Sequence, residues 1–564
     1  MKRFFIALIF FHLGVFLLAQ PQFVPPVNIP IVLNGSFGEI RSNHFHTGID
    51  IRTNGEIGLP VFSIDDGFIS RISVSSGGFG NALYVEHPLG YTSVYGHLDR
   101  FSPEVDQWVG EQQYKKKSFE VNLFPGNDQF KVEKGQEIAK SGNSGASAGP
   151  HLHFEIRHTK NENPVNPLFF GFEVNDKTKP VVENLYVYPL SDNSHVMEAT
   201  QREQFKLVFY GGSYRLKGIQ SINVFGKIGF GVDAIDYFDN NWSRCGIYQM
   251  EYWVDEKLIN SFEIDELDFA KNRYVNSHID YELYQLTRKG VHKTFIEPGN
   301  KLEIYRQTYN GGLFDFDDGK RHKIQIILYD VKMNSSEIIF YVNSTMPVKH
   351  PDLNPTAQFN YHTDNRFSNN EINLYIPVNA LYTDINFEYK MGNVPPAAYS
   401  MLHRVHSQLT PLHLPVELKI KTTNLPSRLT SKALIAQFDI KTGKYSAYGG
   451  VYSGGWIKTE TRSFGDYCVV VDTIAPIIRP LSINNGALNE TNRIRFKISD
   501  NLSGIEKYNG TIDGKWVLFE YDAKREMLTY NFDEKLKYGK THRIELRVED
   551  QKGNINTYES SFYY

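Results

Sequence analysis

Five residues in the first third of the chain have types and spacings suited to metal or acid–base chemistry. They lie in three short motifs, His46-Thr-Gly-Ile-Asp50, Tyr95-Gly96-His97-Leu98 and Pro150-His151-Leu-His153. Imidazole and carboxylate groups bind transition metals, and imidazoles also exchange protons near neutral pH. The 564 residues include 18 histidines, and most of the others are scattered and need no special explanation.

The spacing of His46 and Asp50 constrains the local backbone. In an extended strand, residues i and i+4 lie about 13 Å apart, too far for both to bind one zinc ion at about 2 Å. A helix would bring them together, but Gly48 and the β-branched Thr47 and Ile49 disfavour a helix. The remaining option is a bend at Gly48 that folds the carboxylate back toward the imidazole. Taken alone, the motif also fits a turn with a surface histidine.

Residues 150–157 alternate between apolar and polar side chains, which predicts a strand with two different faces. The face expected to pack on the core carries Leu152, Phe154 and Ile156. The opposite face carries His151, His153, Glu155 and Arg157. The two imidazoles would stand about 7 Å apart, and burying them costs free energy unless something uses them. We expect this face to border a cleft; the alternative is a solvent-facing polar stripe.

The sequence disfavours two other hydrolytic motifs. Gly145-Ala-Ser147-Ala-Gly149 matches the G-x-S-x-G nucleophile elbow, which needs a strand before the serine and a helix after it. Pro150 and a strand of period 2 follow instead, so a serine hydrolase is not expected. No HExxH sequence occurs, which excludes the zinc site that this motif carries on a helix.

The elements that must position these residues are predicted to be β-strands. Residues 30–170 consist of short alternating segments separated by glycine turns, which is typical of a compact antiparallel β domain. The more charged segment 101–130 is interpreted as an insertion on the surface of that domain. Little helical periodicity is found anywhere, so the fold class is predicted to be all-β.

The remainder of the chain contains a weak internal repeat. The matching pairs are Asp176-Lys-Thr-Lys-Pro180 with Asp472-Thr-Ile-Ala-Pro476, Gly246-Ile247 with Gly504-Ile505, and Asp330 and Asn334 with Asp550 and Asn554. We interpret the two copies as immunoglobulin-like β-sandwiches, an enlarged one over 172–345 and another over 472–564. A further β-rich domain is predicted between them, over 346–471.

The composition and the N-terminus indicate a protein that works outside the cytoplasm. A net charge of −4 argues against a nucleic-acid partner or a polybasic membrane binder. Residues 1–19, with Lys2 and Arg3 before an apolar stretch, predict a secretory signal peptide, and no integral membrane segment is expected after its cleavage. We therefore expect export across the inner membrane into the periplasm or cell envelope. The two cysteines, Cys245 and Cys468, are expected to be lone buried thiols.

Together the three motifs resemble those of the lysostaphin/LytM-type zinc metallopeptidases. Flanking residues agree, including Phe37-Gly38, Arg41, Gly80-Asn81 and Gly142-Asn-Ser-Gly145. The resemblance covers about residues 30–170 and makes residues 20–171 a zinc peptidase domain. It implies that His46, Asp50 and His153 bind one Zn²⁺ per chain and that His97 and His151 are the non-ligand catalytic pair, with their separate roles open. His44 is not part of the family's motif.

The resemblance also implies a function. Family members usually cleave peptide cross-links or bridges of bacterial peptidoglycan, so the expected activity is that of a zinc-dependent endopeptidase acting on peptidoglycan peptides. The segment 101–130 is longer than the usual loop and is expected to wall the substrate groove or to block it. The C-terminal β modules are expected to position the enzyme or to bind an envelope protein. The alternative is a catalytically silent envelope scaffold or an activator of other wall hydrolases, although all five site residues are intact.

Overall fold

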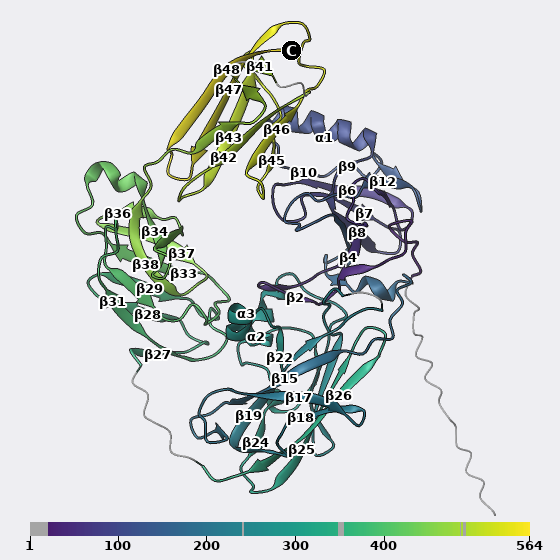
Figure 1. Cartoon of the computed structure of the whole chain (residues 1–564), viewed down its shortest axis with the longest axis vertical. Helices are drawn as coiled ribbons and strands as arrows, with labels where there is room; N and C mark the ends of the chain where they lie inside the picture. Colours follow the sequence, from purple (N-terminus) through teal and green to yellow (C-terminus); the bar gives the residue numbers. More distant parts are fainter. Residues whose placement is uncertain (1–20, 240–241, 348–354, 485–486, 489–491) are drawn as a thin grey trace, which may run out of the picture.

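The computed structural model describes residues 21–239, 242–347, 355–484, 487–488 and 492–564 (Figure 1). The predicted signal peptide, residues 1–19, lies outside the described residues. The described part of the chain is built almost entirely of β-sheets, which confirms the all-β prediction. None of the helices in that part is long and apolar enough to cross a membrane.

The N-terminal domain is organised around one twisted antiparallel sheet that carries all three motifs. Its strands run in the order β1 (Leu33–Gly35), β4 (Ile49–Arg52), β13 (His151–His158), β8 (Tyr91–Leu98), β7 (Asn81–Glu86), β6 (Gly67–Val74) and β10 (Val121–Leu123). As predicted, the side chains of Leu152, Phe154 and Ile156 are fully buried in the core of this domain. The central strand β13 therefore lies between β4 and β8, the strands that carry Asp50 and end near His97.

The segment 101–130 contains a helix that the sequence pattern did not predict. Helix α1 (Pro103–Lys116) starts at a proline and is capped at its C-terminus by Lys117, whose backbone is left-handed. It buries Val105 and Val109 in the core of the N-terminal domain and packs Trp108 partly against it, while most of its other side chains are polar or charged. The apolar face is so narrow that the 3.6-residue period is hard to recognise in the sequence.

Three β modules follow, each with its own hydrophobic core. In the first module, β15 (Val181–Pro189) pairs with β19 (Ile222–Ile235), and β25 (Arg321–Tyr329) pairs with β26 (Ser335–Ser344). The middle module has two five-stranded sheets, one containing β29 (Ile372–Ile376) and β33 (Val416–Lys421), the other β34 (Ala433–Asp439) and β38 (Gly465–Val471). In the last module, β39 (Ile477–Pro480) pairs with β42 (Arg493–Ser499), and β47 (Thr541–Asp550) pairs with β48 (Ile555–Tyr563).

The last module returns to the N-terminal domain and contacts α1 (Figure 1). The Tyr114 hydroxyl donates to the Asp533 carboxylate, and the Trp516 ring meets the Tyr114 ring edge-on at 5.2 Å between centroids. The Lys524 Nζ of the same module donates to the backbone carbonyls of Asn143, at 2.6 Å, and Ser147, at 2.9 Å. The chain thus connects its end to a loop of its first domain.

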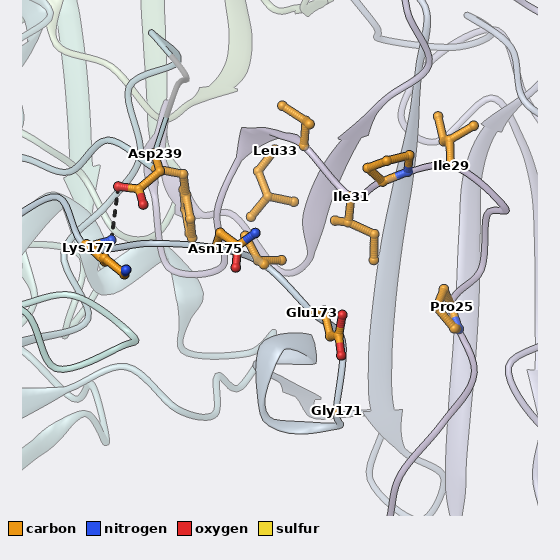
Figure 2. Close-up of a pocket in the computed structure, with 13 residues that line it drawn as sticks. Pro25, Ile29, Ile31, Leu33, Gly171, Glu173, Asn175, Lys177 and Asp239 are labelled. Carbon is orange, nitrogen blue, oxygen red and sulfur yellow. Dashed lines mark hydrogen bonds between the residues drawn. The ribbon is translucent and has the colours of Figure 1, made fainter.

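The N-terminal domain and the first module also share apolar packing. Val174, Phe238 and Cys245 belong to the core of the N-terminal domain, although they lie beyond residue 172. A groove of about 960 Å³ runs along this junction, between residues 25–33 and residues 171–177 (Figure 2). Both cysteines are free and buried, as expected, and they lie in different modules.

Candidate metal centre

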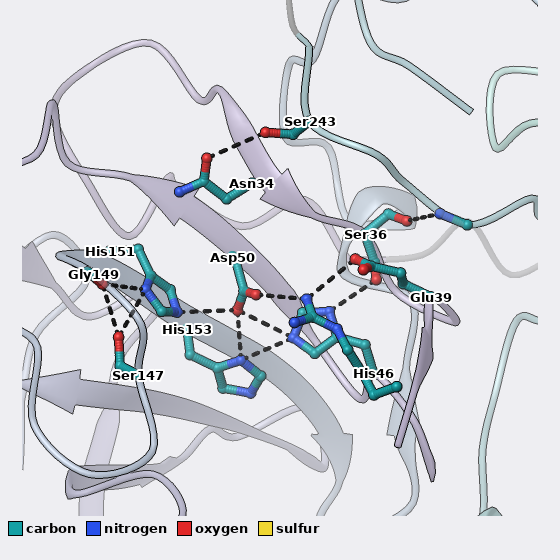
Figure 3. Close-up of polar contacts among 12 residues, drawn as sticks. Asn34, Ser36, Glu39, His46, Asp50, Ser147, Gly149, His151, His153 and Ser243 are labelled. Atoms are coloured by element: carbon teal, nitrogen blue, oxygen red, sulfur yellow. Dashed lines mark hydrogen bonds and ion pairs between the residues drawn. The ribbon is translucent and has the colours of Figure 1, made fainter. Parts of the chain in front are cut away.

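The register of the central sheet brings Asp50 and His153 together. On β4 and β13 these two residues are direct cross-strand partners. His46 precedes β4, and the backbone bends between them so that all three side chains meet, as Figure 3 shows. Gly48 is required at the bend because a Cβ atom there would lie 2.4 Å from the Phe154 carbonyl oxygen. Glycine is thus needed here because the backbone passes close to β13. It is not needed for a left-handed backbone conformation, which glycine also permits.

Three potential ligand atoms converge on one point. His46 Nε2 lies 3.1 Å from Asp50 Oδ1 and 3.1 Å from His153 Nδ1, and His153 Nδ1 lies 2.9 Å from Asp50 Oδ1. Atoms that share a zinc ion at about 2 Å each are separated by little more than 3 Å. The structure therefore brings together the three residues that the sequence proposed as a metal set, and all three are buried.

The outer nitrogens of both imidazoles are held by acceptors. His46 Nδ1 donates to the Ser36 carbonyl at 2.9 Å, and His153 Nε2 donates to Glu155 Oε1 at 2.9 Å. These bonds leave His46 Nε2 and His153 Nδ1 as the metal-facing atoms, since a ligating imidazole commonly donates its other N–H in this way. Two nitrogen lone pairs facing each other at 3.1 Å repel unless a cation or a proton lies between them. The donor set therefore fits a divalent zinc ion.

Glu155 is fully buried, and its negative charge is balanced by the Arg157 guanidinium. Burial raises its pKa, but the Arg157 guanidinium at 2.6 Å and the hydrogen bonds from His153 and Thr47 lower the pKa to about 2. Glu155 is thus a fixed anion behind His153. The polar face of residues 150–157 is therefore a buried network, more deeply enclosed than the cleft edge expected from the sequence.

Asp50 has a cationic partner that the sequence pattern did not assign. Arg41 Nη2 donates to Asp50 Oδ2 at 3.0 Å and to Glu39 at 3.1 Å. Burial by itself raises the pKa of Asp50, whereas the neighbouring histidines hold it well below its usual range. Burial also raises the pKa of Glu39 to about 7. The spacing of Arg41 and Asp50 in the sequence does not predict this pair. Arg41 could be singled out from the sequence only as a flanking residue of the family motif.

The two remaining histidines lie side by side next to the three convergent atoms. The rings of His97 and His151 are 4.8 Å apart between centroids. His97 Nδ1 donates to the Ser144 carbonyl at 2.9 Å, and His151 Nδ1 donates to the Gly149 carbonyl at 2.8 Å. Burial and the nearby His153 lower the pKa of His97 to about 3. Because Nδ1 of each ring is already hydrogen-bonded to a carbonyl, Nε2 is the nitrogen that remains to contact a molecule in the pocket. His151 Nε2 lies 3.4 Å from Asp50 Oδ1.

A pocket of about 630 Å³ gives access to these side chains. Its walls include Phe79, which stacks on His153, and the loop 146–150. None of the described residues that line it belongs to 101–130, so this segment does not wall the pocket. His44 lines the pocket, but its Nδ1 faces the Ser42 carbonyl. Ser147 donates to the Gly149 carbonyl at 2.8 Å and is followed by strand β13, so no nucleophile elbow forms.

Comparison with known proteins agrees with this geometry. A family model described as Peptidase family M23 matches residues 44–114 and 122–167. Lipoprotein NlpD of Yersinia enterocolitica is 32% identical over 114 residues, which cover 20% of this chain and 91% of that protein. The chain belongs to peptidase family M23. A second model, described as a Zu5-like domain, matches residues 356–472 in the middle module.

Other M23 relatives are named as enzymes. DD-carboxypeptidase/endopeptidase Mpg of Neisseria gonorrhoeae is 34% identical over 123 residues, 22% of this chain and 22% of that protein. Peptidoglycan DD-endopeptidase ShyB of Vibrio cholerae is 28% identical over 158 residues, 28% of this chain and 30% of that protein. A mutant catalytic domain of the M23 protein EnpA from Enterococcus faecalis is 26% identical and covers 27% of this chain and 98% of that structure, with a TM-score of 0.20. The chain spans about a fifth of the length of the first curated relatives it matches.

Proposed function

We propose that this M23 protein is a secreted zinc-dependent endopeptidase that hydrolyses peptide cross-links of bacterial peptidoglycan in the cell envelope. The observation that carries the proposal is the convergence of His46 Nε2, Asp50 Oδ1 and His153 Nδ1 within 3.1 Å of one another at the base of a pocket. Two nitrogens and one carboxylate oxygen leave a fourth position of a tetrahedral site free, which a catalytic zinc site requires.

In the proposed mechanism, three side chains hold the zinc ion and two histidines handle protons. His46, Asp50 and His153 would hold the ion, and zinc bound in such a set polarises a carbonyl group and lowers the pKa of a bound water toward neutrality. His97 stays neutral because burial lowers its pKa to about 3, so its Nε2 is an acceptor for a proton or a hydrogen bond. His151, between the Gly149 carbonyl and Asp50, is placed to donate a proton to the departing amine.

Substrate access is supported by the contacts around the pocket. The peptidase pocket has polar groups at its base and an apolar wall at Phe79, which suits an extended peptide. Relatives whose names specify DD-endopeptidase activity favour peptidoglycan cross-links as the substrate class. We propose that the C-terminal β modules contribute contacts to the wall or to an envelope protein.

Digestion of purified, cross-linked muropeptides followed by mass spectrometry tests the proposal and identifies the bond. The zinc-loaded protein should cleave them, and EDTA should abolish cleavage. His151→Ala should keep one zinc per chain and lose turnover by about 10²-fold or more. His158→Ala, at the half-buried far end of the same strand, is the matched control and should retain both zinc and activity.

The alternative of a silent scaffold or activator makes the opposite prediction. A zinc-loaded wild type that cleaves no muropeptide would favour it, provided that Lys524→Ala, which releases the loop at Asn143 and Ser147 from the last module, is equally inactive. Normal digestion by His151→Ala and His153→Ala would show that the catalytic assignment is wrong.

A further inference from the structure

A second group of potential ligands lies outside the peptidase site, at the start of the first β module. Asp176 precedes β15, Asp236 follows β19, and Asp330 follows β25. One oxygen of each carboxylate lies within 4.8 Å of the corresponding oxygens of the other two. These three residues are here called the first aspartate cluster. Three segments separated by at least 60 residues in sequence thus bring three carboxylates to one point.

The carboxylates of this cluster have unused acceptor atoms. Asp236 is only 1% exposed, yet its Oδ1 accepts no hydrogen bond from any described residue. The same holds for Asp176 Oδ2. In the described part of the chain, none of the three carboxylates forms an ion pair with a lysine, arginine or histidine. Buried carboxylates without compensation are costly, so these oxygens need a positive partner.

The pKa values of these aspartates also indicate that the cluster lacks positive charge. Burial and the neighbouring carboxylates Asp176 and Asp330 raise the pKa of Asp236 to about 8. Burial and the carboxylate of Asp330 likewise raise the pKa of Asp176 to about 7. Lys332 is the nearby cation, and it counteracts only part of this effect. Like charges held this close favour either protons or a bound cation.

The last β module contains the same arrangement. Asp472 precedes β39, Asp500 follows β42, and Asp550 ends β47, and these three residues form the second aspartate cluster. Asp472 and Asp550 are each 1% exposed, and Asp500 Oδ1 is buried and accepts no hydrogen bond from the described residues.

One asparagine supports each cluster in the same way. Asn334 Nδ2 donates to the Asp176 carbonyl and to Asp330 Oδ2, and Asn554 Nδ2 donates to the Asp472 carbonyl and to Asp550 Oδ2. The geometry therefore occurs twice in one chain.

We propose that each aspartate cluster binds one Ca²⁺ ion. Three carboxylates without imidazole or thiolate ligands select a hard cation. An oxygen set from strand ends and the loops beside them suits the flexible coordination of Ca²⁺ better than the octahedron of Mg²⁺. This inference does not depend on the zinc site or on the proposed peptidase activity.

The position of each cluster indicates what the cation does. Val174, Phe238 and Val331, each within two residues of a first-cluster aspartate, pack against the core of the N-terminal domain. Figure 2 shows the same junction, where Asp239 accepts a hydrogen bond from the Lys177 backbone. A Ca²⁺ ion here would fix the three loops that join the peptidase domain to the first module.

The second cluster occupies the equivalent joint with the middle module. Leu502, two residues after Asp500, packs against the middle-module cluster that contains Cys468. Lys552, two residues after Asp550, donates to the Gly450 carbonyl at 2.8 Å. Each cation would therefore brace a module against the domain that precedes it.

Equilibrium dialysis of the full chain against ⁴⁵Ca²⁺, after passage over chelating resin and reloading with zinc, tests the proposal. The wild type should bind two Ca²⁺ per chain. Asp236→Asn and Asp500→Asn should each bind one, and the double variant none, while zinc stays at one per chain. Asp192→Asn, a surface carboxylate of the first module, is the matched control and should bind two.

Thermal unfolding distinguishes a bound cation from a merely structural role for these aspartates. Without Ca²⁺, Asp236→Asn should unfold at the same temperature as the wild type or higher, because it removes a repelling charge. With 5 mM Ca²⁺ added, a level of about a hundred times a Kd of ~50 µM, the wild type should gain stability and the variant less. If the folded wild type binds no Ca²⁺ at this concentration, or if both variants still bind two, the proposal is wrong.

Discussion

The histidine site and the first aspartate cluster each bring three side chains together at one point, but their charges are balanced differently. Around His46, Asp50 and His153, Arg41 pairs with the carboxylate, and Glu155 and the Ser36 carbonyl hold the outer imidazole nitrogens. The carboxylates of the aspartate cluster have no cationic side-chain partner among the described residues. The aspartate cluster therefore depends on protons or a cation from outside the chain to balance its charge, whereas the carboxylate of the histidine site also has a side-chain cation beside it.

The two regions also differ in access, which fits the roles proposed for them, catalysis at one and bracing at the other. The histidine site lies at the base of a pocket of about 630 Å³ and has two further imidazoles beside it. The aspartate cluster is at a packed junction, next to residues that belong to the core of the neighbouring domain. A nitrogen-rich set suits zinc and an all-oxygen set suits calcium, so one chain would keep two metals apart by ligand chemistry.

The largest expected effect separates the two metals. His153→Ala should reduce bound zinc from one per chain to near zero and leave both Ca²⁺ ions, because the imidazole is a ligand in one site only. Glu155→Gln should weaken zinc binding by about 10- to 100-fold, since the anion behind His153 is lost. Metal analysis of the purified variants checks both, and loss of Ca²⁺ in His153→Ala would break the comparison.

The next effect compares the two joints after Ca²⁺ is removed. Asp500 Oδ2 accepts hydrogen bonds from two backbone N–H groups, those of Leu502 and Gly504, whereas Asp236 accepts one, from Tyr237. The first joint should therefore loosen more. Hydrogen exchange by mass spectrometry should accelerate more over 172–182 than over 472–480, and an equal or reversed response would contradict the difference in hydrogen bonding.

A smaller effect is expected where the last module contacts α1. Tyr114→Ala removes the hydrogen bond to Asp533 and the ring contact with Trp516, a loss of about 1–2 kcal/mol. Small-angle X-ray scattering should show a more extended molecule, with both metals retained. Tyr538→Ala, an exposed tyrosine of the last module, is the control and should leave the scattering unchanged.

The smallest expected effect is the pH dependence of stability at His322, a buried histidine that is hydrogen-bonded to two aspartates. Burial lowers the pKa of His322, but hydrogen bonds to Asp318 and Asp255 outweigh it and raise the pKa above 6.5. Its stabilisation of the first module, about 1 kcal/mol, should therefore be complete below pH 6.5 and disappear as the pH rises through the folded pKa. Hydrogen exchange in β25 at pH 5.5 and pH 8, corrected for intrinsic rates, measures this. His322→Asn should abolish the difference, and His362→Asn, at an exposed position, should preserve it.

Local patterns predicted much of the fold and part of the site. Alternation over 150–157 correctly separated the core face from the face that carries His151 and His153, because a strand has a period of two. The same rule could not predict α1, whose buried Val105 and Val109 form too narrow an apolar face. The sequence repeat showed that Asp330 and Asn334 correspond to Asp550 and Asn554. It did not show that Asp236 and Asp500 complete the two clusters.

By itself, the sequence determined the β-rich class, the order of the three motifs and the residues capable of holding a metal. Only the tertiary structure decided that His46 Nε2 and His153 Nδ1 face Asp50, that Arg41 pairs with Asp50, and that two sets of three aspartates meet at module joints. The physical reason is distance along the chain. Periodicity reports on neighbours a few residues apart, whereas ligand sets and charge pairs form between segments that only the folded sheets bring together.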